Sequence, residues 1–171
     1  MLQERIEGKW IASFRRVLEL NGIGAGIKVA VVSESQSRPV LRELSEIALY
    51  DLGAAYFTVD LPTPPQTAPV PVKSTGPSIA IANMRPVVEA LKHVEVIVDV
   101  TVEGLLHAEE WPEIEAAGTR LFVVCNEHPE ILERTEPKAD LGPKVARGIE
   151  MLRDAAEMRV CLLYTSPSPR D

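Results

Sequence analysis

Three histidines are the side chains of this chain best suited to acid/base chemistry, because imidazole titrates near neutral pH. His107 and His128 each follow a short apolar segment, whereas His93 precedes one and stands at the end of an expected helix. No two of them have the short spacing of a paired metal-ligand motif. From position alone we expect each histidine to be a surface or helix-capping residue.

Two other reactive groups stand at the ends of apolar runs. Asp99 lies in VIVDV, where a carboxylate must be hydrogen-bonded or functional, and a neighbouring backbone N–H is the commoner partner. Cys125 lies in LFVVC, which predicts a buried structural thiol.

The segment GIGAG at 22–26 looks at first like a dinucleotide-binding loop. Such a loop follows a strand and opens a helix, because its N–H groups must face the phosphates. This segment instead closes a helical pattern and precedes a strand, so it predicts a helix C-cap and a turn.

Predicted helices and strands alternate along the chain, and they must position these reactive groups. We expect helices at 10–21, 39–52, 83–91 with Asn83 as N-cap, 109–117, 129–134 and 141–156, and strands at 27–34, 54–61, 94–102 and 119–125. Residues 62–78 are rich in proline and predict a long loop, and MRV at 158–160 looks like the start of a further strand.

The strands are nearly continuous apolar runs separated by helices, a pattern typical of a parallel sheet covered on both faces. We therefore predict an α/β fold with a doubly wound, mostly parallel, Rossmann-like sheet flanked by helices. Ligands of such sheets bind beyond the carboxyl ends of the strands, where His107 and His128 both fall.

The last eleven residues, CLLYTSPSPRD at 161–171, are what a transposon-end sequencing adapter encodes when it is translated. We interpret 161–171 as an adapter artefact rather than native sequence and leave it out of the fold prediction. Residues 1–160 then form one α/β domain of ordinary size.

Composition narrows the class of protein. The net charge is −7 and no basic patch is evident, which argues against nucleic acid as a partner. The start has no signal-peptide pattern, and no apolar run is long enough to cross a membrane. Within 1–160 Cys125 is the single cysteine, which suits a reducing, cytoplasmic setting.

The order and spacing of several segments carry a family resemblance. They are FRRVLELNGI, KVAVVSE, ALYDLGAAYFTVDLP, NMRPVVEALKHVEVIVD, LLHAEEWPEIEAAGTRLFVV and EHPEILERTEP. Over roughly residues 10–160 the chain resembles the amino-terminal region of the 2,5-dihydroxypyridine 5,6-dioxygenase family and, more distantly, aminopeptidase T-like metallopeptidases.

The resemblance implies a non-haem Fe(II) enzyme that opens an aromatic ring with O₂, with a small aromatic molecule as substrate. It places the two His and one Asp iron ligands in a carboxyl-terminal domain. Residues 1–160 would then be an amino-terminal fragment with no metal ligand and no cofactor of its own, inactive alone, and part of a homo-oligomer when full length.

The resemblance also assigns roles to the pair Leu106-His107, which stands at the family distance from Gly118-Thr119-Arg120. His107 would be the catalytic acid/base group and Leu106 would contact the substrate. The stretch between Asp99 and Leu105 is longer than in the family pattern, and the proline-rich loop is unusual, so the substrate itself stays open.

Two other functions are compatible with the sequence. The domain could belong to a metallopeptidase that uses a metal-bound water as nucleophile. It could also be a small-molecule-binding α/β domain without chemistry. The metal ligands encoded downstream would separate the three.

Overall fold

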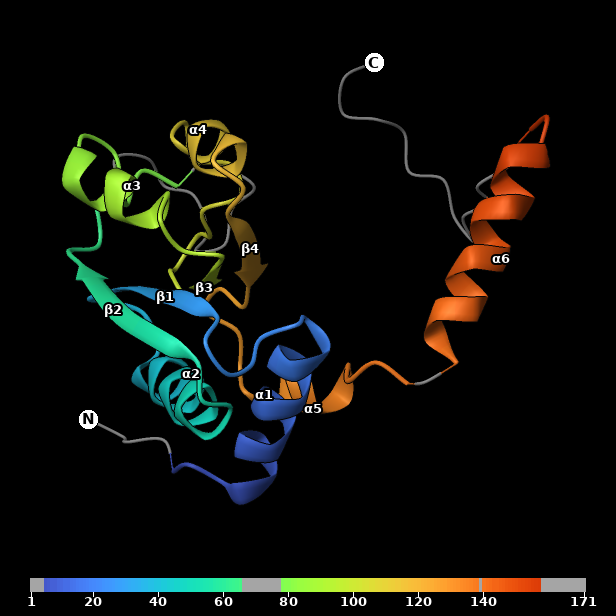
Figure 1. The fold of residues 1–171 in the computed structure, drawn as a ribbon, viewed down its shortest axis with the longest axis horizontal. Coiled ribbons are helices and arrows are strands. Elements are labelled where there is room, and N and C mark those ends of the chain that lie inside the picture. The colour runs from blue at the N-terminus through green and yellow to red at the C-terminus, as the bar shows by residue number, and fades with distance from the viewer. Residues whose placement is uncertain (1–4, 66–77, 139, 158–171) are drawn as a thin grey trace, which may run out of the picture. The chain divides into compact units, whose positions relative to one another are not determined.

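The computed structural model describes residues 5–65, 78–138 and 140–157 (Figure 1). The chain divides into two compact units, residues 1–136 and 137–171, and each is described here by itself. The first unit contains the sheet and its covering helices. The described residues of the second include the helix α6 (Leu141–Asp154).

The first unit is built on a four-stranded sheet of order β2-β1-β3-β4, in which every strand pair is parallel. The strands are β1 (Lys28–Glu34), β2 (Ala55–Leu61), β3 (Val96–Asp99) and β4 (Arg120–Val123). All four predicted strands and the doubly wound parallel sheet are confirmed. β3 and β4 are shorter than expected, because the chain turns into loops directly after Asp99 and Val123.

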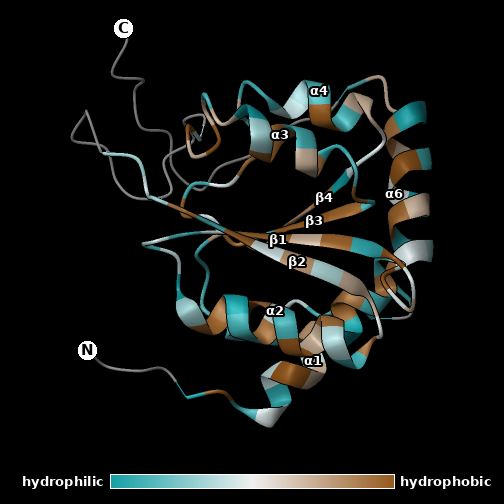
Figure 2. Cartoon of the chain, turned by 60° about the vertical axis from the view of Figure 1, so that its left-hand side comes forward, coloured by the Kyte–Doolittle hydropathy of each residue, from teal (hydrophilic) through white to brown (hydrophobic). Residues whose placement is uncertain are grey.

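Helices cover both faces of the sheet (Figure 2). One face carries α1 (Gly8–Leu20), α2 (Pro39–Asp51) and α5 (Glu130–Arg134), and the other carries α3 (Arg85–Leu91) and α4 (Trp111–Ala116).

Alternation along β1 divides the core between these two layers, because successive strand side chains point to opposite faces. Val29 and Val31 pack with the cluster that contains Phe14 of α1, whereas Ala30 and Val32 join the cluster on the α3–α4 side. The helices on both sides explain why the central strands are apolar up to their last residues, at Val29–Val32 and Val96–Val98.

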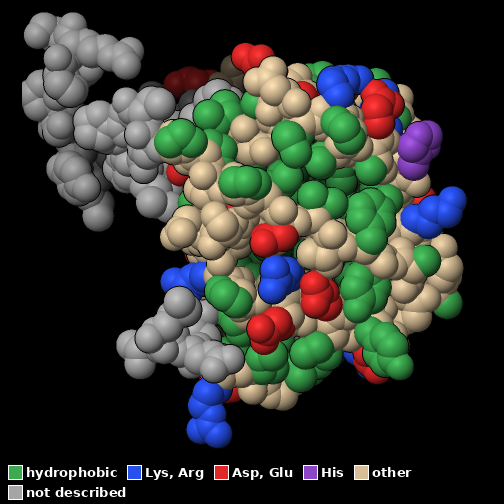
Figure 3. Space-filling model, turned by 90° about the vertical axis from the view of Figure 1, so that its left-hand side faces the viewer, with side chains coloured by type: hydrophobic (Ala, Val, Ile, Leu, Met, Phe, Trp, Pro, Cys, Tyr) green, Lys and Arg blue, Asp and Glu red, His purple; other side chains and the backbone are tan. Residues whose placement is uncertain are grey.

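Both faces of the central strands are covered, but the edge strand β2 is not. The prediction of a sheet covered on both faces was therefore wrong for β2. Every residue of β3 is buried, but most of β2 is exposed, including Tyr56 and Phe57. An edge strand has a neighbouring strand on one side only, so less of its surface is covered. On the face shown in Figure 3, hydrophobic side chains lie among acidic and basic ones.

The glycine segment at 22–26 is a helix cap, as predicted. Gly22 has a φ of 76°, and its N–H donates to the carbonyl of Glu19 at 2.9 Å. The N–H of Ile23 donates to the carbonyl of Leu18 at 3.1 Å. These two bonds form a Schellman motif, and the buried Leu18 and Ile23 supply its apolar contact.

The prediction that Asn83 caps a helix was wrong. α3 begins at Arg85, and its N-cap is Met84, without a side-chain cap bond. Asn83 has a φ of 60°, a left-handed conformation that Asn adopts more readily than most residues. Its place in the preceding turn therefore exploits its backbone tolerance rather than its side chain.

In the second unit α6 ends close to where it was predicted, and none of its residues is buried. The predicted strand start at 158–160 and most of the proline-rich loop, residues 66–77, lie outside the described residues. Within the described parts of the chain, no helix is long and apolar enough to cross a membrane.

Candidate active site

The carboxyl ends of β1 and β3 lie side by side at the centre of the sheet. From β1 the chain continues through α2 to β2, whereas from β3 it continues through α4, on the opposite face, to β4. Such a switch of direction creates a crevice beyond the strand ends, where doubly wound folds bind ligands. Glu34 ends β1 and Asp99 ends β3, and both are buried.

Asp99 is held by hydrogen bonds from the loop that follows it. Its Oδ1 accepts from the backbone N–H of Thr101 at 3.0 Å and from the Thr101 hydroxyl at 2.6 Å. Its Oδ2 accepts from the backbone N–H of Leu105 at 2.6 Å. Burial raises the pKa of Asp99, and these hydrogen bonds oppose the rise. The predicted backbone partner of this carboxylate is thereby confirmed.

Glu34 faces the same loop from β1. Burial raises the pKa of Glu34, and the nearby charges of Asp99 and Glu103 raise it further. Hydrogen bonds from Thr63 and from the backbone of Val102 act in the opposite direction. The loop 100–105 is therefore bonded to the last residues of both central strands.

The loop 100–105 also packs closely against the end of β4 and the turn that follows it. Gly104 has a φ of 82°, and a Cβ placed on it would lie 2.8 Å from the Sγ of Cys125. Cys125 itself has a φ of 51° and is only half-buried, so the expectation of a buried thiol was wrong. It lies in the turn after β4, where its N–H and that of Val124 both donate to the carbonyl of Asp99.

Leu106 and His107 follow this fixed loop directly, and both side chains are exposed. Leu106 lines an open hollow of about 390 Å³ together with Trp111, Glu115 and residues 118–121. The segment Gly118-Thr119-Arg120 thus shares a surface with Leu106. Leu106 therefore lies beside the edge strand β4.

The other two histidines have structural surroundings. The ring of His128 meets Trp10 edge to face, with centroids 5.4 Å apart. Its Nδ1 accepts a hydrogen bond from the N–H of Glu130 at 3.3 Å, so His128 caps the start of α5. His93 is exposed after the end of α3. The surface and capping roles predicted for both are confirmed.

Binding of Fe(II) needs several ligand side chains close together. Within 5–65, 78–138 and 140–157, no three His, Cys, Asp or Glu side chains are grouped so that they could hold a metal ion. This part of the chain therefore does not fit the three-ligand site that the dioxygenase chemistry requires.

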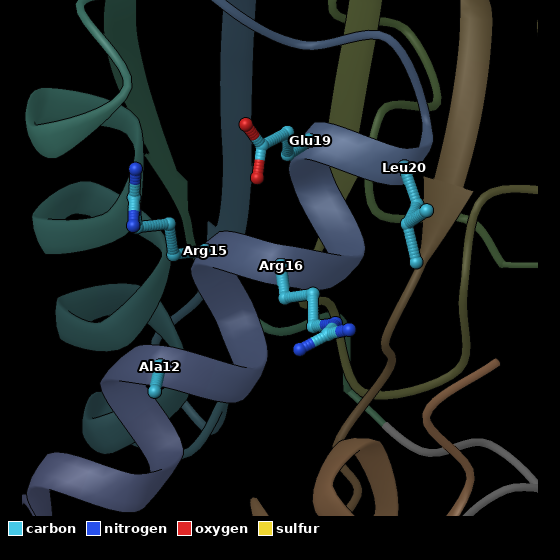
Figure 4. Close-up of a pocket in the computed structure, with 5 residues that line it drawn as sticks. All are labelled: Ala12, Arg15, Arg16, Glu19 and Leu20. Atoms are coloured by element: carbon cyan, nitrogen blue, oxygen red, sulfur yellow. The ribbon is translucent and has the colours of Figure 1, made fainter. Parts of the chain in front are cut away.

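A second hollow lies on the outer side of α1 and is lined by Ala12, Arg15, Arg16, Glu19 and Leu20 (Figure 4). Arg15 pairs with Asp51 of α2 at 2.8 Å, and Arg16 pairs with Glu136 at 2.7 Å. Both arginines are thus engaged in exposed ion pairs, which contribute little to stability. This hollow offers a charged surface and no buried polar group aimed at a ligand.

Two polar residues near the crevice were missed from the sequence. Glu34 carries a signal similar to that of Asp99, because each is an acid at the end of a largely apolar strand. Asn126 gave no such signal: its Oδ1 accepts from the backbone N–H of Arg38 at 2.9 Å, just before α2, across 88 positions of sequence.

The sheet, its helices and the polar ends of its central strands define a doubly wound parallel α/β domain of the kind that binds small molecules at the carboxyl edge. The chain belongs to the 2,5-dihydroxypyridine 5,6-dioxygenase family, whose family model matches residues 9–163. No curated protein matches the chain.

Among solved structures, the chain is similar to the 2,5-dihydroxypyridine dioxygenase from Pseudomonas putida KT2440, with 28% identity and a TM-score of 0.74. The match covers 85% of this chain and 42% of that one, so the chain spans less than half the length of the solved dioxygenase. A match to Klebsiella oxytoca NpsA in complex with 3-hydroxyanthranilyl-AMSN has 15% identity and a TM-score of 0.44, over 74% of this chain and 19% of that one. It is too remote to bear on function.

Proposed function

We propose that this chain is the substrate-side, amino-terminal domain of an enzyme that opens the ring of 2,5-dihydroxypyridine, or of a similar aromatic, with O₂ and Fe(II). The observation that carries the proposal is the family match over residues 9–163. The 28% identical dioxygenase structure supports it. Both favour ring cleavage over the metallopeptidase and over a binding domain without chemistry.

In this proposal His107 is the acid/base group and Leu106 contacts the substrate. Two observations support these roles: the pair is exposed, and it follows a loop that is bonded to both central strands. A histidine at this place can accept or return a proton of a substrate hydroxyl near neutral pH. The domain's part in the reaction is then to bind and orient the aromatic ring.

Fe(II) would be held by residues outside the described part of this chain, because that part has no three-ligand group. We propose that residues 1–160 are native and that 161–171 come from an adapter, with the metal ligands encoded downstream. Sequencing the source gene past codon 160 tests this directly. Two His and one Asp in the continuation are expected, and an uninterrupted gene that encodes CLLYTSPSPRD would contradict the adapter origin.

The activity is tested on the complete gene product, loaded anaerobically with Fe(II) and mixed with 2,5-dihydroxypyridine and O₂. Loss of the substrate's absorbance together with O₂ uptake is expected. Peptide hydrolysis without O₂ uptake would favour the metallopeptidase instead. Purified residues 1–160 with added Fe(II) are expected to show no ring cleavage, and turnover by them would overturn the assignment of the metal to the missing part.

We also propose that the complete enzyme is a cytoplasmic homo-oligomer. Within residues 1–160 the single cysteine, Cys125, suits a reducing compartment. The size of the purified complete enzyme in solution tests the oligomer.

A further inference from the structure

The loop between β3 and α4 is arranged around one buried carboxylate. Asp99 is fully buried, and its two oxygens accept three hydrogen bonds from Thr101 and Leu105. A fourth bond extends the network, because the N–H of Gly104 donates to the Thr101 hydroxyl at 3.1 Å. Three backbone N–H groups of the loop therefore depend, directly or through Thr101, on Asp99.

These bonds hold Leu105, the residue directly before the exposed pair Leu106 and His107. Leu105 is itself fully buried, and its N–H is the last one held by Asp99 before Leu106 and His107. On the other side, the carbonyl of Leu105 accepts from the N–H of Ala108 at 3.0 Å, which closes a tight turn over the pair. The pair is therefore carried by a turn whose first residue is anchored to the end of β3.

We propose that Asp99 is a positioning residue, whose carboxylate fixes the Leu105–Ala108 turn and thereby the places of Leu106 and His107. A carboxylate suits this task, because it has acceptor capacity on both oxygens and each of them faces an N–H donor here. An amide could not replace it, since it offers one acceptor oxygen and turns an N–H donor toward the other partner. This inference rests on the proposed function only for the roles of the exposed pair.

The variant Asp99→Asn tests the inference in the full chain by amide hydrogen exchange and by NMR of the His107 ring. Exchange of the Leu105 N–H is expected to become about 10-fold faster or more, the effect of losing a hydrogen bond to a charged group. The His107 ring signals are expected to shift, while the amides of β1 keep their protection. Asp60→Asn is the matched control, because Asp60 also lies near a strand end but bonds to Ser33 and is exposed.

Unchanged Leu105 exchange and unchanged His107 signals in folded Asp99→Asn would overturn the proposal. A uniform rise in exchange that includes β1, with His107 unmoved, would also overturn it, because Asp99 would then support overall stability alone. If Asp99→Asn does not fold, Thr101→Val removes the hydroxyl that links Asp99 to Gly104. The same local changes, smaller in size, are then expected, and their absence counts against the proposal.

A kinetic measurement on the complete enzyme separates this inference from the proposed function. If the wild type cleaves the ring, Asp99→Asn is expected to lower kcat about 10-fold or more with a small change in KM, because misplaced groups lose transition-state geometry. Unaltered kcat would overturn the proposal. If the wild type shows no ring cleavage, the proposed function fails, and the exchange and NMR results alone decide the role of Asp99.

Discussion

Gly104 and Cys125 approach so closely that a Cβ on the glycine would lie 2.8 Å from the cysteine Sγ. The contact joins the loop after β3 to the turn after β4. Both residues also have left-handed backbone angles, with φ values of 82° and 51°. The two loops at the carboxyl edge of the sheet therefore pack closely, and a methyl group on Gly104 would require one of them to shift.

Gly104→Ala is expected to destabilise the domain by about 3 kcal/mol, through the left-handed backbone and the clash together. Gly26→Ala separates the two causes, because Gly26 has a φ of 83° but no atom within 4 Å of its Cβ position. That control is expected to cost about 1 kcal/mol. Urea unfolding of both variants provides the measurement.

Cys125→Ala in the Gly104→Ala background is expected to recover part of the loss, because it removes the sulfur that the new methyl group meets. The interaction energy of this double-mutant cycle isolates the contact from the backbone effect. Full additivity of the two substitutions would show that no clash occurs.

Glu34 is expected to make the stability of the domain depend on pH. Its pKa is raised in the folded state, chiefly by burial, so the folded protein binds its proton more tightly than the unfolded chain does. The contribution of Glu34 is therefore most favourable below the unfolded pKa and is lost as pH rises through the folded value. Relative to the wild type, Glu34→Gln should gain stability as pH rises above the ordinary pKa of Glu.

Glu89→Gln provides a control of opposite sign. The pKa of Glu89 is lowered, first by its hydrogen bond from Lys92, so its contribution is present above the unfolded pKa and is lost as pH falls. Relative to the wild type, this variant should lose stability as pH rises. Denaturation curves at several pH values check both variants, and parallel pH profiles for Glu34→Gln and wild type would refute the assignment.

Thr119 links the end of α3 to the start of β4 through hydrogen bonds of its side chain. Its buried hydroxyl lies 3.0 Å from the carbonyl of Leu91 and 2.9 Å from that of Val94. Thr119→Val keeps the shape but removes the donor, so a loss of about 1–2 kcal/mol in unfolding free energy is expected.

Thr58→Val is the matched control for this substitution. Thr58 is exposed on β2 and bonds only to the Glu46 side chain among the contacts described for it, so its loss is expected to stay within about 0.5 kcal/mol. Equal losses for the two variants would mean that the buried hydrogen bonds of Thr119 contribute no more than a surface one.

In the complete enzyme, His107→Ala is expected to lower turnover by about 10²–10⁴-fold, the contribution of a general acid/base group. His93→Ala serves as the control, because His93 is also exposed but lies between α3 and the start of β3, at the opposite end of the strand from the loop that precedes His107. Steady-state ring cleavage by both variants is the measurement. Equal turnover in His107→Ala and wild type would leave His107 as an ordinary surface residue.

Much of the fold could be read from local pattern. The apolar runs of β1 and β3, the helical spacing of α1 and the cap at Gly22 all follow from residues near one another in sequence. So does the need of Asp99 for a partner, because a buried carboxylate is costly wherever it lies. Such features can be predicted locally, because the side chains that a helix or strand buries recur at the fixed spacing of that element.

Only the tertiary structure decided which groups meet. In the folded chain the Leu105 N–H donates to Asp99, and the Val102 backbone forms a hydrogen bond with Glu34. Asn126 accepts a hydrogen bond from the N–H of Arg38. The tertiary structure also left β2 exposed and placed Leu106 beside β4. Such pairings depend on strand order and on the path of each loop, which arise when distant elements pack together, and no short window of sequence contains that information.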